Sequence, residues 1–384
     1  MTVRDIQSMW KTRVVSSCLV SFFLGVSSAA YAGAPSEWGA AGDTIKINDL
    51  VPRLYDSEGY GEKYTFVAQI KTEADEATGQ GEQTGRFYFS LSISNLGGGD
   101  HKLEAKGALE LGEKSFKWKV KRQKGKWRSA KGKLDIKAGG VHLSGTVEQL
   151  VFNVQNGDET LEIKFKPIVE TWRPTGGGLQ LGDGNNAEFS LFPLAEIAGQ
   201  LKNKNGDLNE LRGHGWGRHT WSQLGPHEWS LWNIQLRVFD PAHKRALFIR
   251  RLRTGEDYSK SERSYGLLIE DGKRVFEGYM LSLEQKKSYR DKKHDNQYSF
   301  PTDFVLTGVD VKSGARFRGQ FETGKRHYRR NPIQNLPWIK RKAVELVTKP
   351  MEYAYELKYE ISLSGTTSLS IKGEDGRYEA YFFN

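Results

Sequence analysis

The residues best suited to chemistry gather in one short stretch of this sequence. Between positions 214 and 233 the chain holds three histidines and four tryptophans. Tryptophan rings can enclose an apolar ligand while a histidine or an arginine contacts its polar end. We therefore expect a ligand-binding site formed by Trp216, Arg218, His219, Trp221, Trp229 and Trp232.

Acid–base catalysis is a second use of the same stretch. His219 is a candidate general acid or base, and Glu228 is the candidate to orient it if the protein is an enzyme. The histidines of this stretch follow no standard metal-ligand spacing, so neither a metal nor a cofactor is predicted. A purely structural interpretation also stands, in which the tryptophans close the end of a barrel and the histidines lie in solvated turns.

These residues must be positioned by strands, because apolar and polar side chains alternate along much of the chain. Apolar residues occupy every second position in 87–93 and in 116–120. A turn at 123–125 followed by 126–128 predicts a hairpin with the second of these strands. Further strand candidates recur with turn residues between them, which is typical of a sandwich or a barrel. Helical spacing in Pro337–Thr348 predicts one short amphipathic helix.

The composition agrees with an all-β fold. The chain has 384 residues, of which 12% are aromatic and 42 are glycine, and its mean hydropathy is −0.62. Aromatic and β-branched residues with abundant glycine favour short strands and turns over a helical bundle. The aromatic content is too high for a disordered chain, and the collagen, coiled-coil and multi-span membrane classes are excluded.

The first 32 residues have the pattern of an export signal. Three cations surround the start of an apolar stretch from Val14 to Ala29, and Ala30–Ala32 offers a small-x-small cleavage site. We therefore expect residues 1–32 to be cleaved and the mature protein to be periplasmic or secreted. The single cysteine, Cys18, would be lost with them, so no disulfide is expected.

One internal boundary is expected within the mature chain. The stretch 173–186 is rich in glycine, asparagine and proline, as linkers often are. We predict one β-domain over residues 33–180 and a second over residues 181–384, which carries the tryptophan-rich stretch. We expect the protein to be a monomer.

The chain is basic, with 57 Lys and Arg against 47 Asp and Glu and a net charge of +10. An exported protein is not expected to meet nucleic acid, so the predicted partner is an anionic membrane surface, where each cation contributes about 1 kcal/mol. In the alternative interpretation the lysines lie on a solvated exterior and protect an edge strand. The candidate membrane-docking residues are Lys117, Lys119, Lys121, Lys124, Lys126, Arg128, Arg329 and Arg330.

The segment Gly213–Trp221 resembles a motif of a known family. It reads Gly-His-Gly-Trp-Gly-Arg-His-Thr-Trp and follows a serine-containing strand at 189–194 and a Gly-Gln-Leu turn at 199–201. This order is similar to that of the double-lipocalin-like family of carotenoid 1,2-hydratases, AttH-type proteins and fungal survival-factor proteins. Residues 373–381 also resemble that family's last strand. The resemblance implies an all-β fold of two tandem lipocalin-like antiparallel β-barrels or half-barrels, with the short helix in the C-terminal domain.

One departure from the family pattern bears on catalysis. Where the pattern has an aspartate before the histidine, this chain has Arg218. The hydratase reaction that the resemblance implies needs an acid to protonate an alkene, and an arginine cannot act as that acid because it stays protonated at any working pH. The resemblance therefore transfers a ligand cavity, with Trp216, His219 and Trp221, better than it transfers an active site.

Three functions follow as hypotheses. We expect an exported protein that binds or transfers a hydrophobic small molecule, a lipid or an isoprenoid, in a hollow inside a barrel that opens near Trp216 and His219, and that docks on anionic membranes. The first alternative is a hydratase, isomerase or cyclase acting on an apolar isoprenoid-like substrate, which requires a further ionisable side chain beside His219. The second alternative is a carbohydrate-binding sandwich with an open, tryptophan-lined groove.

Overall fold

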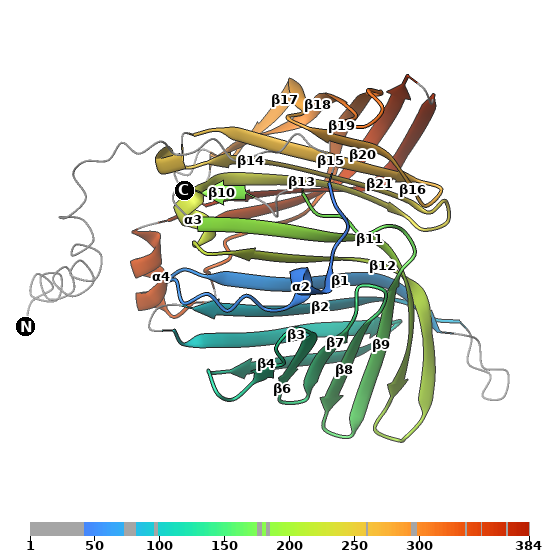
Figure 1. Ribbon diagram of the computed structural model, residues 1–384, viewed down its shortest axis with the longest axis vertical. Coiled ribbons are helices and arrows are strands. Elements are labelled where there is room, and N and C mark those ends of the chain that lie inside the picture. The colour runs from blue at the N-terminus through green and yellow to red at the C-terminus, as the bar shows by residue number, and fades with distance from the viewer. Residues whose placement is uncertain are drawn as a thin grey trace, which may run out of the picture.

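The computed structural model consists of two antiparallel β-sheets, one above the other (Figure 1). The export signal expected at residues 1–32 lies outside the described residues, so its prediction stands untested. The structure describes residues 42–72, 82–95, 99–174, 179–181, 185–258, 260–292, 298–334, 336–346, 348–365 and 368–383.

The first sheet has twelve strands and runs in the order β4-β3-β2-β1-β12-β11-β9-β8-β7-β6-β5, with β10 paired to β11. Nearly every strand pairs with its neighbour in sequence, and β1 closes onto β12 at the centre of the sheet. The strands are β1 (Gly61–Thr72), β2 (Thr84–Asn95), β3 (His101–Leu111), β4 (Lys114–Arg122), β5 (Arg128–Ser129), β6 (Leu134–Ala138), β7 (Val141–Gly145), β8 (Leu150–Asn156), β9 (Glu159–Pro167), β10 (Leu179–Leu181), β11 (Asn185–Lys202) and β12 (Leu208–Ser222).

The second sheet has nine strands in the order β16-β15-β14-β13-β21-β20-β19-β18-β17. The prediction of an all-β fold with two antiparallel half-barrels is thereby confirmed. The strands are β13 (Ser230–Asp240), β14 (Arg245–Thr254), β15 (Glu262–Glu270), β16 (Lys273–Tyr279), β17 (Ser282–Arg290), β18 (Ser299–Val309), β19 (Arg316–Arg330), β20 (Met351–Ser364) and β21 (Leu369–Phe382).

The chain passes from the first sheet to the second between Ser222 and Ser230. The domain boundary expected near residue 180 does not coincide with this crossing, because β11 and β12 pair with β9 and β1 of the first sheet. Figure 1 shows β11 and β12 in the layer that faces the second sheet. The strand with the Gly213–Trp221 motif therefore lies at the contact between the two sheets.

The hairpin expected around residue 124 is wrong. The turn is present, with the Lys126 amide donating to the Gln123 carbonyl at 3.0 Å. However, β4 pairs with β3 and β5 pairs with β6, at opposite edges of the first sheet. β3 offers β4 a ladder over its full length, whereas the return segment offers only the two residues of β5. Since a strand has two edges, the pairing with β3 does not itself exclude the hairpin; the second edge of β4 simply carries no ladder in the described part of the chain.

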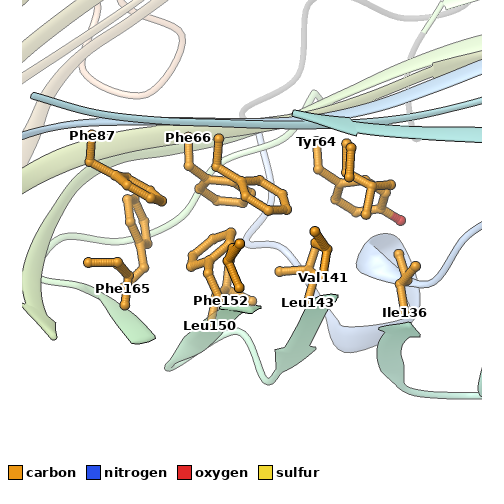
Figure 2. Packing of buried hydrophobic residues seen from close by; sticks show 14 of the residues in the cluster. Tyr64, Phe66, Phe87, Ile136, Val141, Leu143, Leu150, Phe152 and Phe165 are labelled. Carbon is orange, nitrogen blue, oxygen red and sulfur yellow. The ribbon is translucent and has the colours of Figure 1, made fainter. Parts of the chain in front are cut away.

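Each half-barrel is filled by its own side chains. In the first, Phe66 and Phe87 from one wall meet Phe152 and Phe165 from the opposite wall (Figure 2), and all four are buried. In the second, the space left beside Phe304 measures only about 10 Å³, close to the minimum for one water molecule. The expectation of an open hollow inside a barrel is therefore wrong, because the alternating aromatic residues pack against one another.

The helices are short. They are α2 (Ile47–Leu50), α3 (Pro226–Trp229) and α4 (Trp338–Glu345), with one 3₁₀ turn, η2 (Glu256–Tyr258). α4 confirms the helix expected in the C-terminal part of the chain. Within the described part of the chain, no helix has the length and apolar character needed to cross a membrane.

We predict that Phe152→Ala destabilises the protein by about 3–5 kcal/mol. The Phe152 ring lies 4.7 Å from Phe66 and 4.8 Å from Phe89, between centroids, and is fully buried. Its removal therefore leaves a cavity that the surrounding rings cannot close. Denaturant unfolding measures the loss, and Phe152→Leu, which keeps most of the volume, is the milder control. Equal stabilities of the alanine variant and the parent would contradict this account of the core.

Candidate functional site

β12 presents alternate residues to two different surroundings, because side chains along a strand point to opposite faces. His219 faces the core of the first half-barrel and is stacked on Tyr64, with 4.1 Å between ring centroids. Its neighbour Arg218 faces the second sheet and donates to Gln235 on β13 at 2.6 Å. Two residues that are adjacent in the motif therefore serve different parts of the molecule.

The glycines of the motif lie on the core side of β12, in phase with His219. A Cβ at Gly217 would lie 2.3 Å from the Phe66 ring, and one at Gly213 would lie 2.0 Å from the Gln69 carbonyl. Both distances are too short for any side chain. The glycine pattern is thus explained by close packing of β12 against β1.

His219 forms a buried hydrogen bond with Glu62 on β1. The distance from His219 Nε2 to Glu62 Oε1 is 2.6 Å, and both side chains have at most 1% of their surface exposed. Glu62 also accepts from Tyr60, from Tyr64 at 2.9 Å and from the Arg53 amide at 3.0 Å. Burial and the Glu62 carboxylate both raise the pKa of the Tyr60 and Tyr64 hydroxyls far above 10.

This cluster fastens the segment before β1 to the sheet. His219 Nδ1 lies 2.7 Å from the Asp49 carbonyl, which can only accept, so Nδ1 carries a proton. The Tyr64 hydroxyl lies 2.8 Å from the Leu50 carbonyl, and the Leu54 amide donates to Tyr60. Every polar atom of His219 is therefore occupied by the protein itself.

A pocket near the motif lies between the two sheets, beside the half-barrel cores. It measures about 350 Å³, within the usual range of small-molecule sites. Aromatic and aliphatic residues from both sheets form one part of its wall, and three cations are placed among polar residues of both sheets. The cations are Lys63, Arg218 and Arg250, and the apolar residues include Phe189, Trp221, Leu224, Trp229, Leu252 and Phe383.

The cations of this pocket are held by neutral partners. Arg218 contacts the amide oxygen of Gln235, and Arg250 Nε donates to Asn233 Oδ1 at 3.2 Å. Lys63 keeps exposed surface, but the protein around it desolvates the ammonium group and lowers its pKa to about 8, with a further contribution from Arg218. The pocket thus combines apolar and cationic lining residues, and Arg250 lies over the Phe189 ring at 5.6 Å.

Trp216 lies on the same face as Arg218 but outside this pocket. Its ring is covered by the Arg237 guanidinium at 4.2 Å, and it borders a space of only about 20 Å³. Burial would raise the pKa of the neighbouring Glu379, but Arg237 and Arg377 lower it to about 2. Trp216 is therefore part of a polar contact that joins the two sheets.

Of the remaining candidate ligand-binding residues, some line the intersheet pocket and others lie elsewhere. Trp221 and Trp229 are buried and line the intersheet pocket. Trp232 packs instead against the core of the second half-barrel. Glu228 is exposed and accepts from the Gly225 amide, so the carboxylate that reaches His219 is that of Glu62.

Some of the candidate membrane-docking cations are exposed on the surface, whereas others are ion-paired on β19. Along the edge strand β4, lysines alternate outward with buried Phe116 and Trp118. Arg329 is largely buried and pairs with Asp291 at 2.7 Å, and Arg330 pairs with Glu352. Arg330 remains exposed despite this pair, and the other exposed candidates are Lys117, Lys119, Lys121, Lys124, Lys126 and Arg128.

Sequence reasoning missed the residues that surround His219 and those that supply the other wall of the pocket. Glu62 is in phase with Tyr60, Tyr64 and Phe66, so the alternation of β1 already placed a carboxylate on a buried face. Arg250 on β14 carried no such signal, because its role depends on the second sheet packing against the first. Among the described residues, no group of three or more His, Cys, Asp or Glu side chains is placed to hold a metal ion.

Comparison with solved structures finds similar chains over nearly the whole length. A protein assigned as AttH from Nitrosomonas europaea is 15% identical, with 91% of this chain and 98% of that chain covered and a TM-score of 0.49. CghA with Sch210972 is 11% identical, with 92% and 96% covered and a TM-score of 0.49. Kievitone hydratase from Nectria haematococca is 11% identical, with 92% and 98% covered and a TM-score of 0.48.

An AttH and a hydratase are thus among these structures, as the resemblance of the Gly213–Trp221 segment suggested. No protein-family model and no curated protein matches the sequence.

We predict that Glu62→Gln destabilises the protein by about 3 kcal/mol, since it breaks a buried, hydrogen-bonded charge site. Both carboxylate oxygens of Glu62 accept hydrogen bonds. Whichever oxygen the glutamine NH₂ group replaces, that group would therefore face another hydrogen-bond donor. Denaturant unfolding measures the loss. The matched control is Glu82→Gln, whose exposed ion pair with Lys71 at 3.2 Å contributes at most about 1 kcal/mol. Equal effects of the two substitutions would contradict a structural role for the Glu62 cluster.

Proposed function

We propose that this protein binds a hydrophobic small molecule in the pocket between its two sheets. The observation that carries the proposal is the space of about 350 Å³ walled by Phe189, Trp221, Trp229, Leu252 and Phe383. An apolar wall with a few placed polar groups is the usual composition of a small-molecule site. The ligand site is therefore assigned to the intersheet contact and no longer to a barrel interior.

Binding is favoured over acid–base catalysis by the state of His219. An ionisable group does lie beside it, since Glu62 is 2.6 Å away. However, both side chains are sealed from solvent, and their polar atoms are already hydrogen-bonded within the protein. A general acid or base must reach its substrate directly or through one water molecule. The hydratase, isomerase or cyclase alternative is accordingly the weaker one.

We predict that Ser92→Phe weakens the binding of an apolar probe at least tenfold. Ser92 lines the pocket from β2, and a phenylalanine there would occupy the space while remaining compatible with a strand. Binding of 1-decanol, followed by tryptophan fluorescence, measures the effect. Ser144→Phe, on β7 and outside the pocket lining, is the control. Undiminished binding by a folded Ser92→Phe variant would contradict the assignment of the site.

We further propose that the protein is exported and docks on anionic membrane surfaces through α4 and the exposed lysines of β4. Trp338, Ile339 and Leu346 are 66%, 62% and 89% exposed, and Arg341 and Lys342 lie between them in the sequence. Apolar residues with adjacent cations suit the boundary of an anionic bilayer. α4 lies at the end of the molecule where β12 leads into α3 (Figure 1), and pocket residues Ser222 and Trp229 flank that turn.

We predict that Ile339→Asp reduces binding to vesicles that contain phosphatidylserine by at least fivefold. The substitution puts a carboxylate where an apolar side chain would enter the lipid boundary. Leu208→Asp is the matched control, because Leu208 is also 62% exposed but lies at the start of β12. Vesicle co-sedimentation with and without phosphatidylserine measures the effect. Equal loss in the two variants, or equal binding to neutral vesicles, would contradict docking through α4.

A further inference from the structure

We propose that the ligand of the intersheet pocket is an amphipathic anion whose negative group is held by Lys63, Arg218 and Arg250. This inference rests on the proposed function and specifies its ligand class: an apolar body with one carboxylate or comparable anionic group, as in a medium-chain fatty acid.

The three cations belong to facing walls of one space. Lys63 lies on β1 and Arg218 on β12, where Lys63 pairs with Thr220 and Arg218 pairs with Thr65, so the two cations are diagonal neighbours on one face. Arg250 lies on β14 of the second sheet, opposite Gln235 in the ladder. Because Gln235 also accepts from Arg218, it connects the two walls. An anion between the sheets would thus meet donors from both sides.

Within the part of the chain that the structure describes, no carboxylate forms an ion pair with any of these three cations. Glu62 is the single carboxylate among the described lining residues, and its oxygens are taken by His219, Tyr60, Tyr64 and Arg53. The three cations therefore have no carboxylate at ion-pair distance among the described residues, and Glu379 and Glu352 act on Arg218 and Lys63 only from farther away. Placing several cations around a partly desolvated space is costly unless an anion joins them.

The apolar lining residues of the pocket indicate that the rest of the ligand is apolar. Trp221, Trp229, Leu252 and Phe383 contribute apolar side chains to the lining. A small inorganic anion would leave this surface unused, and a neutral hydrocarbon would leave the cations without a partner. An amphipathic anion satisfies both halves at once.

Lys63 should make the affinity for such a ligand depend on pH. The charged groups that act on it are Arg218 on β12, Lys106 on β3, Glu352 on β20 and Arg330 on β19, and burial with these neighbours gives it a pKa of about 8. Lys63 is a cation below this pH and neutral above it, whereas a carboxylate ligand is ionised throughout. The affinity for the anion should therefore fall as the pH rises from 7 to 9.

The test compares decanoate with 1-decanol, which share a chain length and differ in charge. At pH 7, titration followed by tryptophan fluorescence or calorimetry should show decanoate binding at least tenfold more tightly. Arg250→Gln should weaken decanoate binding about tenfold more than it weakens decanol binding. Lys63→Met should remove the fall in decanoate affinity between pH 7 and 9. Lys164→Met, on the exposed side of β9, is the control for loss of one cation, and thermal unfolding shows that each variant is folded.

The outcomes separate this inference from the proposed function. Equal affinities for decanoate and decanol would overturn the anionic ligand class while leaving a hydrophobic site in place. Absence of binding by both probes would contradict the proposed function itself. If Lys63→Met leaves the pH dependence of decanoate binding unchanged, Lys63 does not bind the anion. If Lys164→Met loses as much decanoate affinity as the pocket variants do, the effect comes from overall charge and not from the site.

Discussion

The central strands of the first sheet are covered on both faces, and this constraint determines the role of every residue in the motif. One face of β1 and β12 packs into the half-barrel core, and the other faces the second sheet. Side chains on a strand alternate between its faces, so neighbouring residues cannot share one surrounding. His219 and Arg218 are adjacent in sequence, yet one belongs to a sealed core cluster and the other to the pocket between the sheets.

The two polar groupings that result differ in how their charges are satisfied. Glu62 is buried, but it is hydrogen-bonded to His219 and accepts from two tyrosines and a backbone amide. Such a carboxylate holds the segment before β1 in place and has no capacity left for a ligand. Arg218 and Arg250 donate to neutral amide oxygens and form no ion pair with a carboxylate among the described residues, so much of their hydrogen-bonding capacity remains available. The proposed ligand site is therefore better assigned to Arg218 and Arg250, whose hydrogen-bonding groups are less fully used, than to the Glu62 cluster.

Many elements of the fold could be predicted from the local pattern of apolar and polar residues in the sequence. The alternation in 87–93 and in 116–120 gave correct strands in β2 and β4, and helical spacing gave α4. The hairpin around residue 124 failed because a turn signal identifies a reversal of the chain and not the strand that each arm will pair with. The open barrel interior failed for a related reason. Alternation shows which face is apolar, but Phe66 and Phe152 come from strands far apart in sequence, and only their meeting fills the space.

The sequence by itself determined the class of fold, the phase of each strand and the segment in which polar and aromatic residues concentrate. These properties depend on neighbours along the chain, which are present in any conformation. The partner of His219, the location of the pocket and the meeting of Lys63 and Arg218 with Arg250 were decided by the tertiary structure alone. They depend on the registry of β1 with β12 and on the second sheet packing against the first, and no local spacing encodes either contact.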